Sequence, residues 1–297
     1  MSAEAQGLVF VAHRRHFEVH LDDGYDIECV QKGRQQQIAC GDRVRVSVAA
    51  AGGGVIDAVL PRTSLFRRSD AYRDKVIAAN VTQVVAVVAP DVAVDEYLLN
   101  RWIVAAEAQD CRFVLVANKR DLPSYAALKS RMDFYVTLGY PVVEVSARQS
   151  VAALAPYLAG QHSVLIGQSG MGKSTLVNAL APGSAARVGE LSAALGSGKH
   201  TTTVSTLYRL PELDDAWIVD SPGVKAFGIA RIEPDALAHA FVEMRPWIGH
   251  CRFRDCRHLR EPGCAILDAA AAGKIAPQRL ALYHTLLDEA QSARAYP

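Results

Sequence analysis

The stretch "SVLIGQSGMGKSTL" (residues 163–176) decides the fold of the central part of this chain. It holds the pattern G-x-x-x-x-G-K-S between an apolar, strand-like run and a helix-forming run, which is the setting of a phosphate-binding loop. Gly167 and Gly172 let the backbone turn tightly, so that its N–H groups face the phosphates, and the following helix N-terminus adds positive potential. We expect Lys173 to contact the β- and γ-phosphates and Ser174 to hold Mg²⁺.

The predicted nucleotide contacts of this loop extend from its first glycine into the first turn of the following helix. They are Gly167, Gln168, Ser169, Gly170, Met171, Gly172, Lys173, Ser174 and Thr175. The motif identifies a nucleoside triphosphate but not its base, so it also fits an ATPase or a small-molecule kinase. A glycine-rich turn with an incidental Lys-Ser pair is the alternative without a function, and the flanking strand and helix argue against it.

Further along, "WIVDSPG" (217–223) is an apolar strand that ends in D-x-x-G. We expect Asp220 to lie at the end of this strand, near the Mg²⁺ held by Ser174, and the N–H of Gly223 to reach the γ-phosphate. The D-x-x-G pattern is weak by itself, and its position at a strand end after a phosphate loop strengthens it.

A base-reading loop is predicted earlier in the chain, where "FVLVANKRD" (113–121) places N-K-x-D after an apolar strand. One carboxylate, that of Asp121, would accept both the N1–H and the 2-amino group of guanine, a donor pair that adenine lacks. Asn118 would hold the purine edge and brace neighbouring loops, and the stem of Lys119 would cover the face of the base. In isolation such a tetrapeptide is usually a polar turn.

Ser146 and Ala147 end another apolar run, and we expect a backbone N–H there to reach guanine O6. From residue 76 onward, strand-like runs alternate with helical stretches, which predicts an α/β domain with a mainly parallel sheet. Ligands bind such sheets at the carboxyl ends of the strands, where all these motifs fall. The predicted strands are 83–89, 113–117, 141–147, 163–167, 205–210 and 217–220, and the clearest helical periodicity is at 96–109, 235–244 and 277–291.

The first sixty residues contain short β-rich runs with turn signals between them and no clear helix. A small barrel fits this pattern, and a five-stranded OB-type barrel, a β-sandwich and an SH3-like barrel all remain open. Residues 60–75 are polar and basic, and we interpret them as a linker. The β-rich runs are 7–12, 16–21, 25–30, 43–48 and 54–60.

A cysteine-rich loop, "CRFRDCRHLREPGC" (251–264), follows the α/β part. Three thiolates and one imidazole would satisfy tetrahedral Zn²⁺ and leave no open position, so the predicted zinc site is structural. His250 is a competing ligand, although His258 lies inside the loop, and unliganded reduced cysteines are the alternative. The predicted ligands are Cys251, Cys256, His258 and Cys264.

Composition excludes several classes of protein. Half of the 297 residues are apolar, 21% are charged and the net charge is +1, so any nucleic-acid surface must be local. The longest apolar runs are too short to span a bilayer, and the first residues show no export signal. We therefore expect a cytoplasmic protein. Five arginines against one acid at 245–260, and the basic stretch at 60–75, indicate contacts with a phosphate backbone, with ordinary solvated arginines as the alternative.

The order of these motifs resembles a known family. N-K-R-D, then S-A, then the phosphate loop, then a threonine run and D-S-P-G is the order of a circularly permuted GTPase. With a β-barrel in front and a Cys/His loop behind, essentially the whole chain resembles the bacterial ribosome-small-subunit-dependent GTPases, the RsgA/YjeQ family. The resemblance implies an OB-fold barrel at 1–62, a circularly permuted P-loop GTPase domain at 63–232 and a mainly helical zinc-binding domain at 233–297.

By the same resemblance, "GKHTTT" (198–203) is the first switch, and Thr201 or Thr202 reaches Mg²⁺ and the γ-phosphate. Val224 stands where Ras-like GTPases carry a water-positioning glutamine, so hydrolysis should be slow without a partner. His200 is our candidate for the missing catalytic group, and a solvent-exposed switch histidine without a catalytic role is the alternative.

The leading hypothesis is a monomeric GTPase that converts GTP to GDP and phosphate with Mg²⁺. The resemblance implies that it binds the small ribosomal subunit and its rRNA, assists late subunit maturation and has no membrane partner. An ATP-dependent P-loop kinase, which predicts no guanine preference, and a nucleic-acid-binding module with a structural nucleotide are the competing hypotheses.

Overall fold

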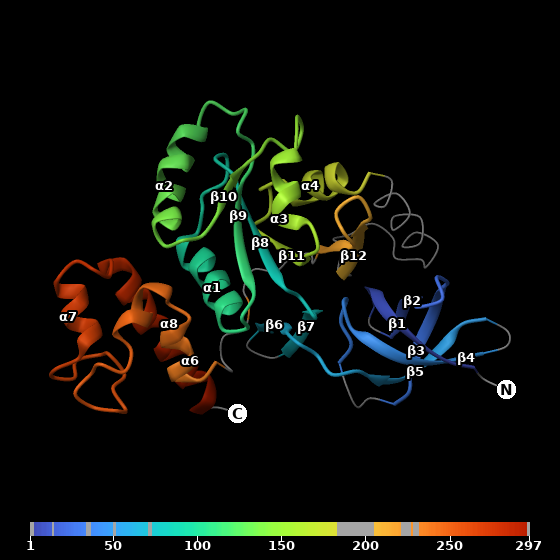
Figure 1. Ribbon diagram of the computed structural model, residues 1–297, viewed down its shortest axis with the longest axis horizontal. Helices are drawn as coiled ribbons and strands as arrows, with labels where there is room; N and C mark the ends of the chain where they lie inside the picture. Colours follow the sequence, from blue (N-terminus) through green and yellow to red (C-terminus); the bar gives the residue numbers. More distant parts are fainter. Residues whose placement is uncertain are drawn as a thin grey trace.

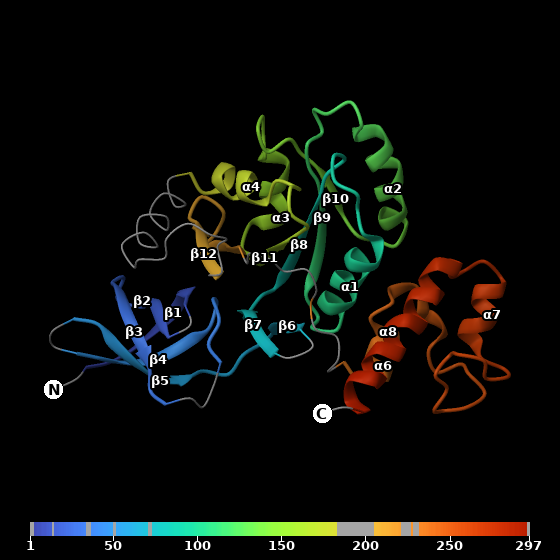
Figure 2. The ribbon, with the colours of Figure 1, turned by 180° about the vertical axis from the view of Figure 1, so that it is seen from behind.

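The computed structural model describes residues 3–13, 15–33, 37–49, 52–70, 73–182, 205–220, 227 and 232–295. An N-terminal barrel, a central α/β part and a C-terminal helical part follow one another along the long axis of the molecule (Figure 1). The barrel and the helical part lie at opposite ends, with the α/β part between them, and the view from behind agrees (Figure 2).

The N-terminal strands close into a barrel. β1 pairs antiparallel with both β2 and β4, β2 with β3, and β4 with β5, while β3 and β5 run parallel. This closed circuit is the OB-type arrangement, so the structure selects that option over a sandwich. The strands are β1 (Ala3–Ala12), β2 (His16–Leu21), β3 (Asp26–Gln31), β4 (Arg43–Val48) and β5 (Gly54–Val59).

The predicted linker at 60–75 was wrong for most of its length. β6 (Leu65–Asp70) and β7 (Arg73–Ala79) form a two-stranded antiparallel sheet there. The many basic residues made this segment look like a surface linker. Its apolar side chains nevertheless hold the hairpin in place, since Phe66 is buried in the central core. Arg62, just before the hairpin, pairs with the buried Asp42 of the barrel at 2.7 Å.

The central sheet is parallel except for its edge strand β12, which runs antiparallel to β13. Its order is β10-β9-β8-β11-β13-β12, and β12 also pairs with β1, so the barrel and the central sheet are continuous. These pairings confirm the predicted mainly parallel sheet. The strands are β8 (Gln83–Val88), β9 (Arg112–Ala117), β10 (Val142–Glu144), β11 (His162–Ile166), β12 (Ser205–Leu210) and β13 (Ala216–Asp220).

Helices cover both faces of this sheet, with α1 and α2 on one side and α3 and α4 on the other (Figure 1). Covering both faces explains why every residue of β8 is buried, as its unbroken apolar run predicts. Asp95 caps α1 by accepting a hydrogen bond from the N–H of Leu98 at 3.0 Å. The helices are α1 (Glu96–Glu107), α2 (Tyr125–Thr137), α3 (Ala155–Leu158), preceded by η1 (Ala152–Leu154), and α4 (Lys173–Leu180).

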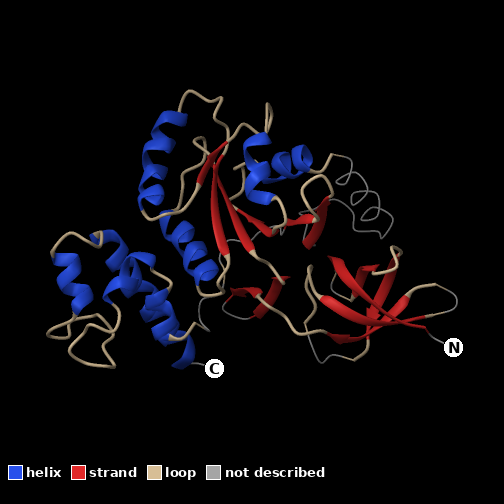
Figure 3. Cartoon of the chain, in the orientation of Figure 1, coloured by secondary structure: helices blue, strands red, loops and turns tan. Residues whose placement is uncertain are grey.

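The C-terminal part consists of helices and loops in the residues described (Figure 3). The single helix expected at 235–244 was wrong: Phe241 has extended backbone angles, which end the α-helix before a 3₁₀ segment that contains Pro246. The buried core of this part includes Val104 of α1, so α1 is shared with the central part. The elements are α6 (Pro234–His239), η2 (Val242–Trp247), α7 (Ala265–Ala271) and α8 (Pro277–Ala295). No helix among the described residues has both the length and the apolarity to cross a bilayer.

Candidate functional site

The phosphate loop connects β11 to α4, as the sequence predicts. Gly167 has φ +152°, and a Cβ there would lie 2.6 Å from the carbonyl oxygen of Val87. Gly172 has φ +92°, and a Cβ there would lie 2.5 Å from Nδ2 of Asn118. Only glycine fits these two positions, because each has a positive φ and a neighbouring atom too close to leave room for a side chain.

Asn118 ties three loops together from a buried position. Its Nδ2 donates to the carbonyl of Met171 in the phosphate loop, and its Oδ1 accepts from the N–H of Ala147, both at 3.0 Å. The predicted bracing role matches these contacts. The N–H of Ala147, which could have read guanine O6, is engaged with Asn118, so a bond to O6 would have to share or replace this contact.

Lys119 joins the base-reading loop to the phosphate loop. It has φ +59°, and its Nζ donates to the carbonyl of Gly170 at 2.7 Å and to Asp91 at 2.5 Å. Asp91 was not predicted from the sequence, although its position shortly after β8 places it at the same edge of the sheet as the other motifs. Asp91 therefore fixes the direction of the Lys119 side chain.

Asp121 presents an ionised carboxylate at the open side of the site. The hydroxyl of Ser146 donates to its Oδ1 at 2.6 Å, and this hydrogen bond holds the pKa of Asp121 below its usual range. Arg148 also favours the charged form. An ionised carboxylate has acceptor capacity for two further donors after Ser146 is satisfied.

These loops and the phosphate loop line one cavity of about 450 Å³, a size within the range of small-molecule sites. It unites the predicted base reader and phosphate cradle, which lie far apart in the sequence. Leu122 and Arg148 also line it and were not predicted. The lining residues are Asp91, Asn118, Lys119, Asp121, Leu122, Ser146, Ala147, Arg148, Ser169, Gly170, Gly172, Lys173, Ser174 and Thr175.

Three predicted loop residues are not in this wall. Gly167 lies at the base of the loop against Val87, and the side chain of Met171 is fully buried in the core. Gln168 turns toward α1, where its Oε1 accepts from the N–H of Asp95 at 3.1 Å. The side chains of Gln168 and Met171 therefore shape the loop, and any contact they make with a nucleotide would be through the backbone.

Lys173 and Asp220 lie in the part of the site where the phosphates and Mg²⁺ are predicted to bind. Nζ of Lys173 donates to the carbonyls of Gly167 at 2.7 Å and Gln168 at 3.1 Å, and burial lowers its pKa. Burial raises the pKa of Asp220, and the charge of nearby Lys173 partly offsets this. Oδ1 of Asp220 is buried with no hydrogen-bond partner among the described residues, so it is available to a cation. His200, Thr201, Thr202 and Gly223 lie outside the described residues.

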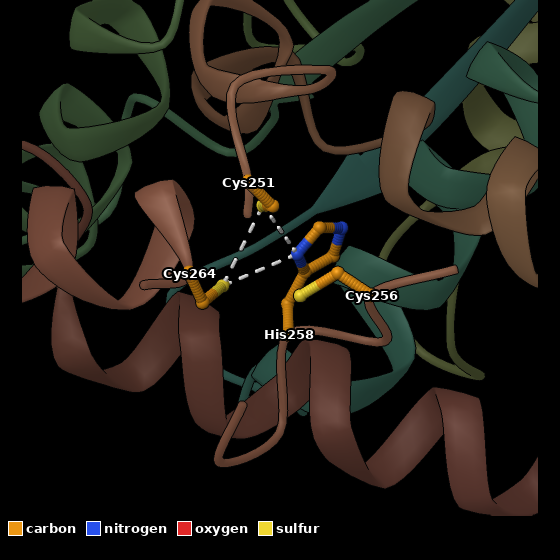
Figure 4. Close-up of side chains that lie close together, drawn as sticks. All are labelled: Cys251, Cys256, His258 and Cys264. Carbon is orange, nitrogen blue, oxygen red and sulfur yellow. Dashed lines mark hydrogen bonds between the residues drawn. The ribbon is translucent and has the colours of Figure 1, made fainter. Parts of the chain in front are cut away.

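The predicted cysteine and histidine ligands converge in the C-terminal part (Figure 4). All four ligand atoms lie within 4.8 Å of one another, with 3.8 Å between the sulfurs of Cys251 and Cys264. Nδ1 of His258 lies 3.3 Å from Cys264 and 3.5 Å from Cys251. Metal–sulfur bonds of about 2.3 Å in a tetrahedron imply sulfur separations of about 3.8 Å, so the cluster fits such an ion. Cys256 completes the group, and His250 is not part of it.

The loop that carries these ligands is held by Glu261. Burial alone would raise the pKa of Glu261, but hydrogen bonds from backbone N–H groups of its own loop lower it to about 2. Its carboxylate accepts from the N–H of Arg257 and of Leu259, both at 2.7 Å. His284 of α8 also contacts the carbonyl of His258 at 2.7 Å. His258 itself has φ +59°, and its ring lies against the sulfurs of Cys251 and Cys264.

Comparison with known proteins matches residues 59–230 to the model of the RsgA GTPase family. A Nitrosomonas europaea protein named small ribosomal subunit biogenesis GTPase RsgA is 46% identical over 285 residues, covering 95% of this chain and 90% of the relative. A Bordetella pertussis protein of the same name is 45% identical over 299 residues, which cover 99% of each chain.

Two solved structures share the architecture. YjeQ from Thermotoga maritima has a TM-score of 0.72 and 30% identity, with 97% of this chain and 99% of that chain covered. YloQ, described as a circularly permuted GTPase, has a TM-score of 0.70 with 98% and 96% covered, and at 24% identity the likeness concerns the fold. The predicted permuted fold is thereby confirmed.

Proposed function

The chain belongs to the RsgA GTPase family, and from this premise we propose that it hydrolyses GTP to GDP and phosphate with Mg²⁺. We further propose that it acts on the small ribosomal subunit, whose biogenesis appears in the names of its relatives. The observation that carries the proposal is the single cavity in which Asn118 and Asp121 face the same space as Lys173 and Ser174.

On the base side, the ionised carboxylate of Asp121 would accept N1–H and the 2-amino group of guanine. Asn118 cannot turn toward the base without breaking two buried hydrogen bonds, so its role is to hold Met171 and Ala147 in place. Lys119, directed by Asp91, would cover one face of the base. This donor and acceptor pattern favours the GTPase hypothesis over a kinase that uses ATP.

On the phosphate side, Lys173 would exchange its two carbonyl acceptors for β- and γ-phosphate oxygens, since an ammonium group has three rotatable donors. Ser174, exposed at the start of α4, and the Asp220 oxygen that has no partner among the described residues suit the hard oxygen ligation that Mg²⁺ prefers. The ion would neutralise charge on the phosphates. We propose that Thr201 or Thr202 completes its coordination and that His200 assists attack by water.

The donor set of the cysteine cluster indicates which ion it would hold. Three thiolates and one imidazole in a closed tetrahedron are typical of structural Zn²⁺, and we propose one zinc ion per chain. Zinc would replace the thiol protons and so anchor α6, α7 and α8 around a loop with few apolar contacts of its own.

Removing one ligand should therefore release zinc and destabilise the C-terminal part. For Cys264→Ser we expect loss of stoichiometric zinc by elemental analysis and a fall of about 10 °C or more in the unfolding temperature of that part. Cys111→Ser is the matched control, because Cys111 is buried outside the cluster and donates to the carbonyl of Val81. Full zinc retention by Cys264→Ser would refute the assignment.

We propose that the surface of the metal-binding loop contacts rRNA. The exposed ring of Phe253 on the metal-binding loop lies between the exposed Arg252 and Arg254 in the sequence, with the guanidinium of Arg252 over that ring at 5.5 Å. Guanidinium groups bind phosphates, and aromatic rings and guanidinium planes stack on unpaired RNA bases. The barrel at the other end of the molecule has the OB-type fold, which often binds oligonucleotides.

Sedimentation with purified small ribosomal subunits tests this proposal. With a non-hydrolysable GTP analogue we expect co-sedimentation that weakens with salt, and Arg254→Gln should weaken it and lower the salt slope by about one. Arg131→Gln, on α2 and away from the metal-binding loop, should leave both unchanged. No co-sedimentation of the wild type would contradict the proposed partner.

A further inference from the structure

Arg101 of α1 is a buried cation that contacts two distant segments of the chain. The residue is 6% exposed. Its Nε donates to the carbonyl of Phe227 at 2.7 Å, and its Nη1 pairs with the carboxylate of Glu289 in α8. Because the guanidinium is planar and always charged, it binds these two partners in a fixed geometry.

Phe227 lies seven residues after Asp220, between the nucleotide site and the C-terminal part. It is fully buried, and its ring packs against Phe66 of β6 with the centroids 4.8 Å apart. Its position is therefore fixed by its ring on the hairpin and by its carbonyl on Arg101. If Phe227 moves, it must either break one of these two contacts or move the contacting residue with it.

Glu289 provides the charged partner on α8. Burial would raise the pKa of its carboxyl, but hydrogen bonds from Arg101 and Tyr97 more than offset this and hold it below the usual range. The hydroxyl of Tyr97 donates to Glu289 at 2.7 Å. A buried guanidinium that loses one partner is costly, so Arg101 favours arrangements in which Phe227 and Glu289 are both in reach.

The same helix also contacts the phosphate loop and carries a second link to α8. Gln168 accepts from the N–H of Asp95 at the start of α1, so α1 begins at the nucleotide site. Asn100 pairs with Arg279 of α8, which in turn binds Glu243 at 2.5 Å. Asn100 thus anchors α8 to α1, whereas Arg101 joins α8 to Phe227, seven residues after the end of β13.

We propose that Arg101 is a positioning residue that links Phe227 to α8, so that the C-terminal part responds to the nucleotide in the central cavity. The inference rests on the proposed function only in requiring that the cavity binds guanine nucleotides. Its distinct content is that one side chain carries the link.

Hydrogen–deuterium exchange of the full chain tests this link without ribosomal subunits. In the wild type, amides of α8 should exchange at rates that differ by about fivefold or more between GDP and a non-hydrolysable GTP analogue. Glu289→Gln keeps the shape but removes the charge, and Arg101→Lys keeps the charge but cannot bind both partners. In both variants we expect this difference between nucleotides to disappear while both nucleotides still bind.

Arg245→Gln is the matched control. Arg245 also joins the C-terminal part to α1, through Glu107 at 2.5 Å. Its other contact, to the carbonyl of His239, lies within the C-terminal part, and neither partner is Phe227. This variant should keep the nucleotide-dependent difference. The proposal is overturned if the wild type shows no difference, if Glu289→Gln or Arg101→Lys retains it, or if Arg245→Gln loses it equally. Exchange that responds to nucleotide in a protein that ribosomal subunits do not stimulate would count against the proposed function alone.

Discussion

Replacing Asp121 with asparagine is expected to lower the affinity for GTP by at least about 100-fold, since a charge-assisted pair of hydrogen bonds is worth roughly 3 kcal/mol or more. The carboxylate accepts two donors from guanine, and the amide can accept only one while directing its NH₂ at the other. Xanthine carries an oxygen in place of the 2-amino group, so the same variant should bind xanthosine triphosphate better than the wild type does.

Competition binding with GTP, ATP and xanthosine triphosphate measures this change. Asp91→Asn is the control, because Asp91 lines the same cavity but contacts Lys119, so it should weaken GTP binding modestly with no preference for xanthine. Unchanged GTP affinity in Asp121→Asn would show that this loop does not read the base. Equal affinity of the wild type for ATP and GTP would favour a kinase.

Replacing Lys173 with methionine is expected to slow GTP cleavage by about 100-fold to 1,000-fold, the usual cost of removing one donor that stabilises transition-state charge. Methionine has nearly the same volume as the half-buried lysine side chain, but it has no hydrogen-bond donor for the phosphates. Single-turnover hydrolysis at saturating GTP separates this effect from weaker binding. His200→Ala belongs in the same assay with small subunits added, and unchanged stimulated turnover there would remove His200 from the catalytic proposal.

The reach of the sequence can be judged from particular residues. Local patterns sufficed for the phosphate loop and for the strands of the central sheet, since glycine spacing and continuous apolar runs can be recognised in short windows of sequence. Asp91 was missed because its role depends on Lys119 reaching it across two loops. The hairpin at 65–79 was missed because its strands are rich in charged residues and the ring of Phe66 packs against Phe227, far along the chain.

The closed barrel also depends on distant pairing. The parallel contact between β3 and β5 joins segments separated by β4, and the sequence alone left a sandwich and an SH3-like barrel open. The Cys/His cluster was more predictable, because its four residues fall within one short loop and only their convergence depends on the fold.

The permuted order leaves the nucleotide site intact. β9 and β10 precede β11 in the chain, yet each motif still lies at the carboxyl end of its strand in the parallel sheet. What changes is the connection: the strand that ends in Asp220 is the last of the sheet, and the chain then passes Phe227 and enters the C-terminal part. The proposed nucleotide site and the proposed partner surface are therefore joined by a short stretch of chain.

The most direct measurement is the rate of GTP hydrolysis by the wild-type protein alone, with purified small ribosomal subunits, and with large subunits. We expect slow turnover alone, at least about a tenfold increase with small subunits, as for GTPases that depend on a partner, and no comparable increase with large subunits. A protein that binds GTP but hydrolyses it at the same rate in all three conditions would contradict the account.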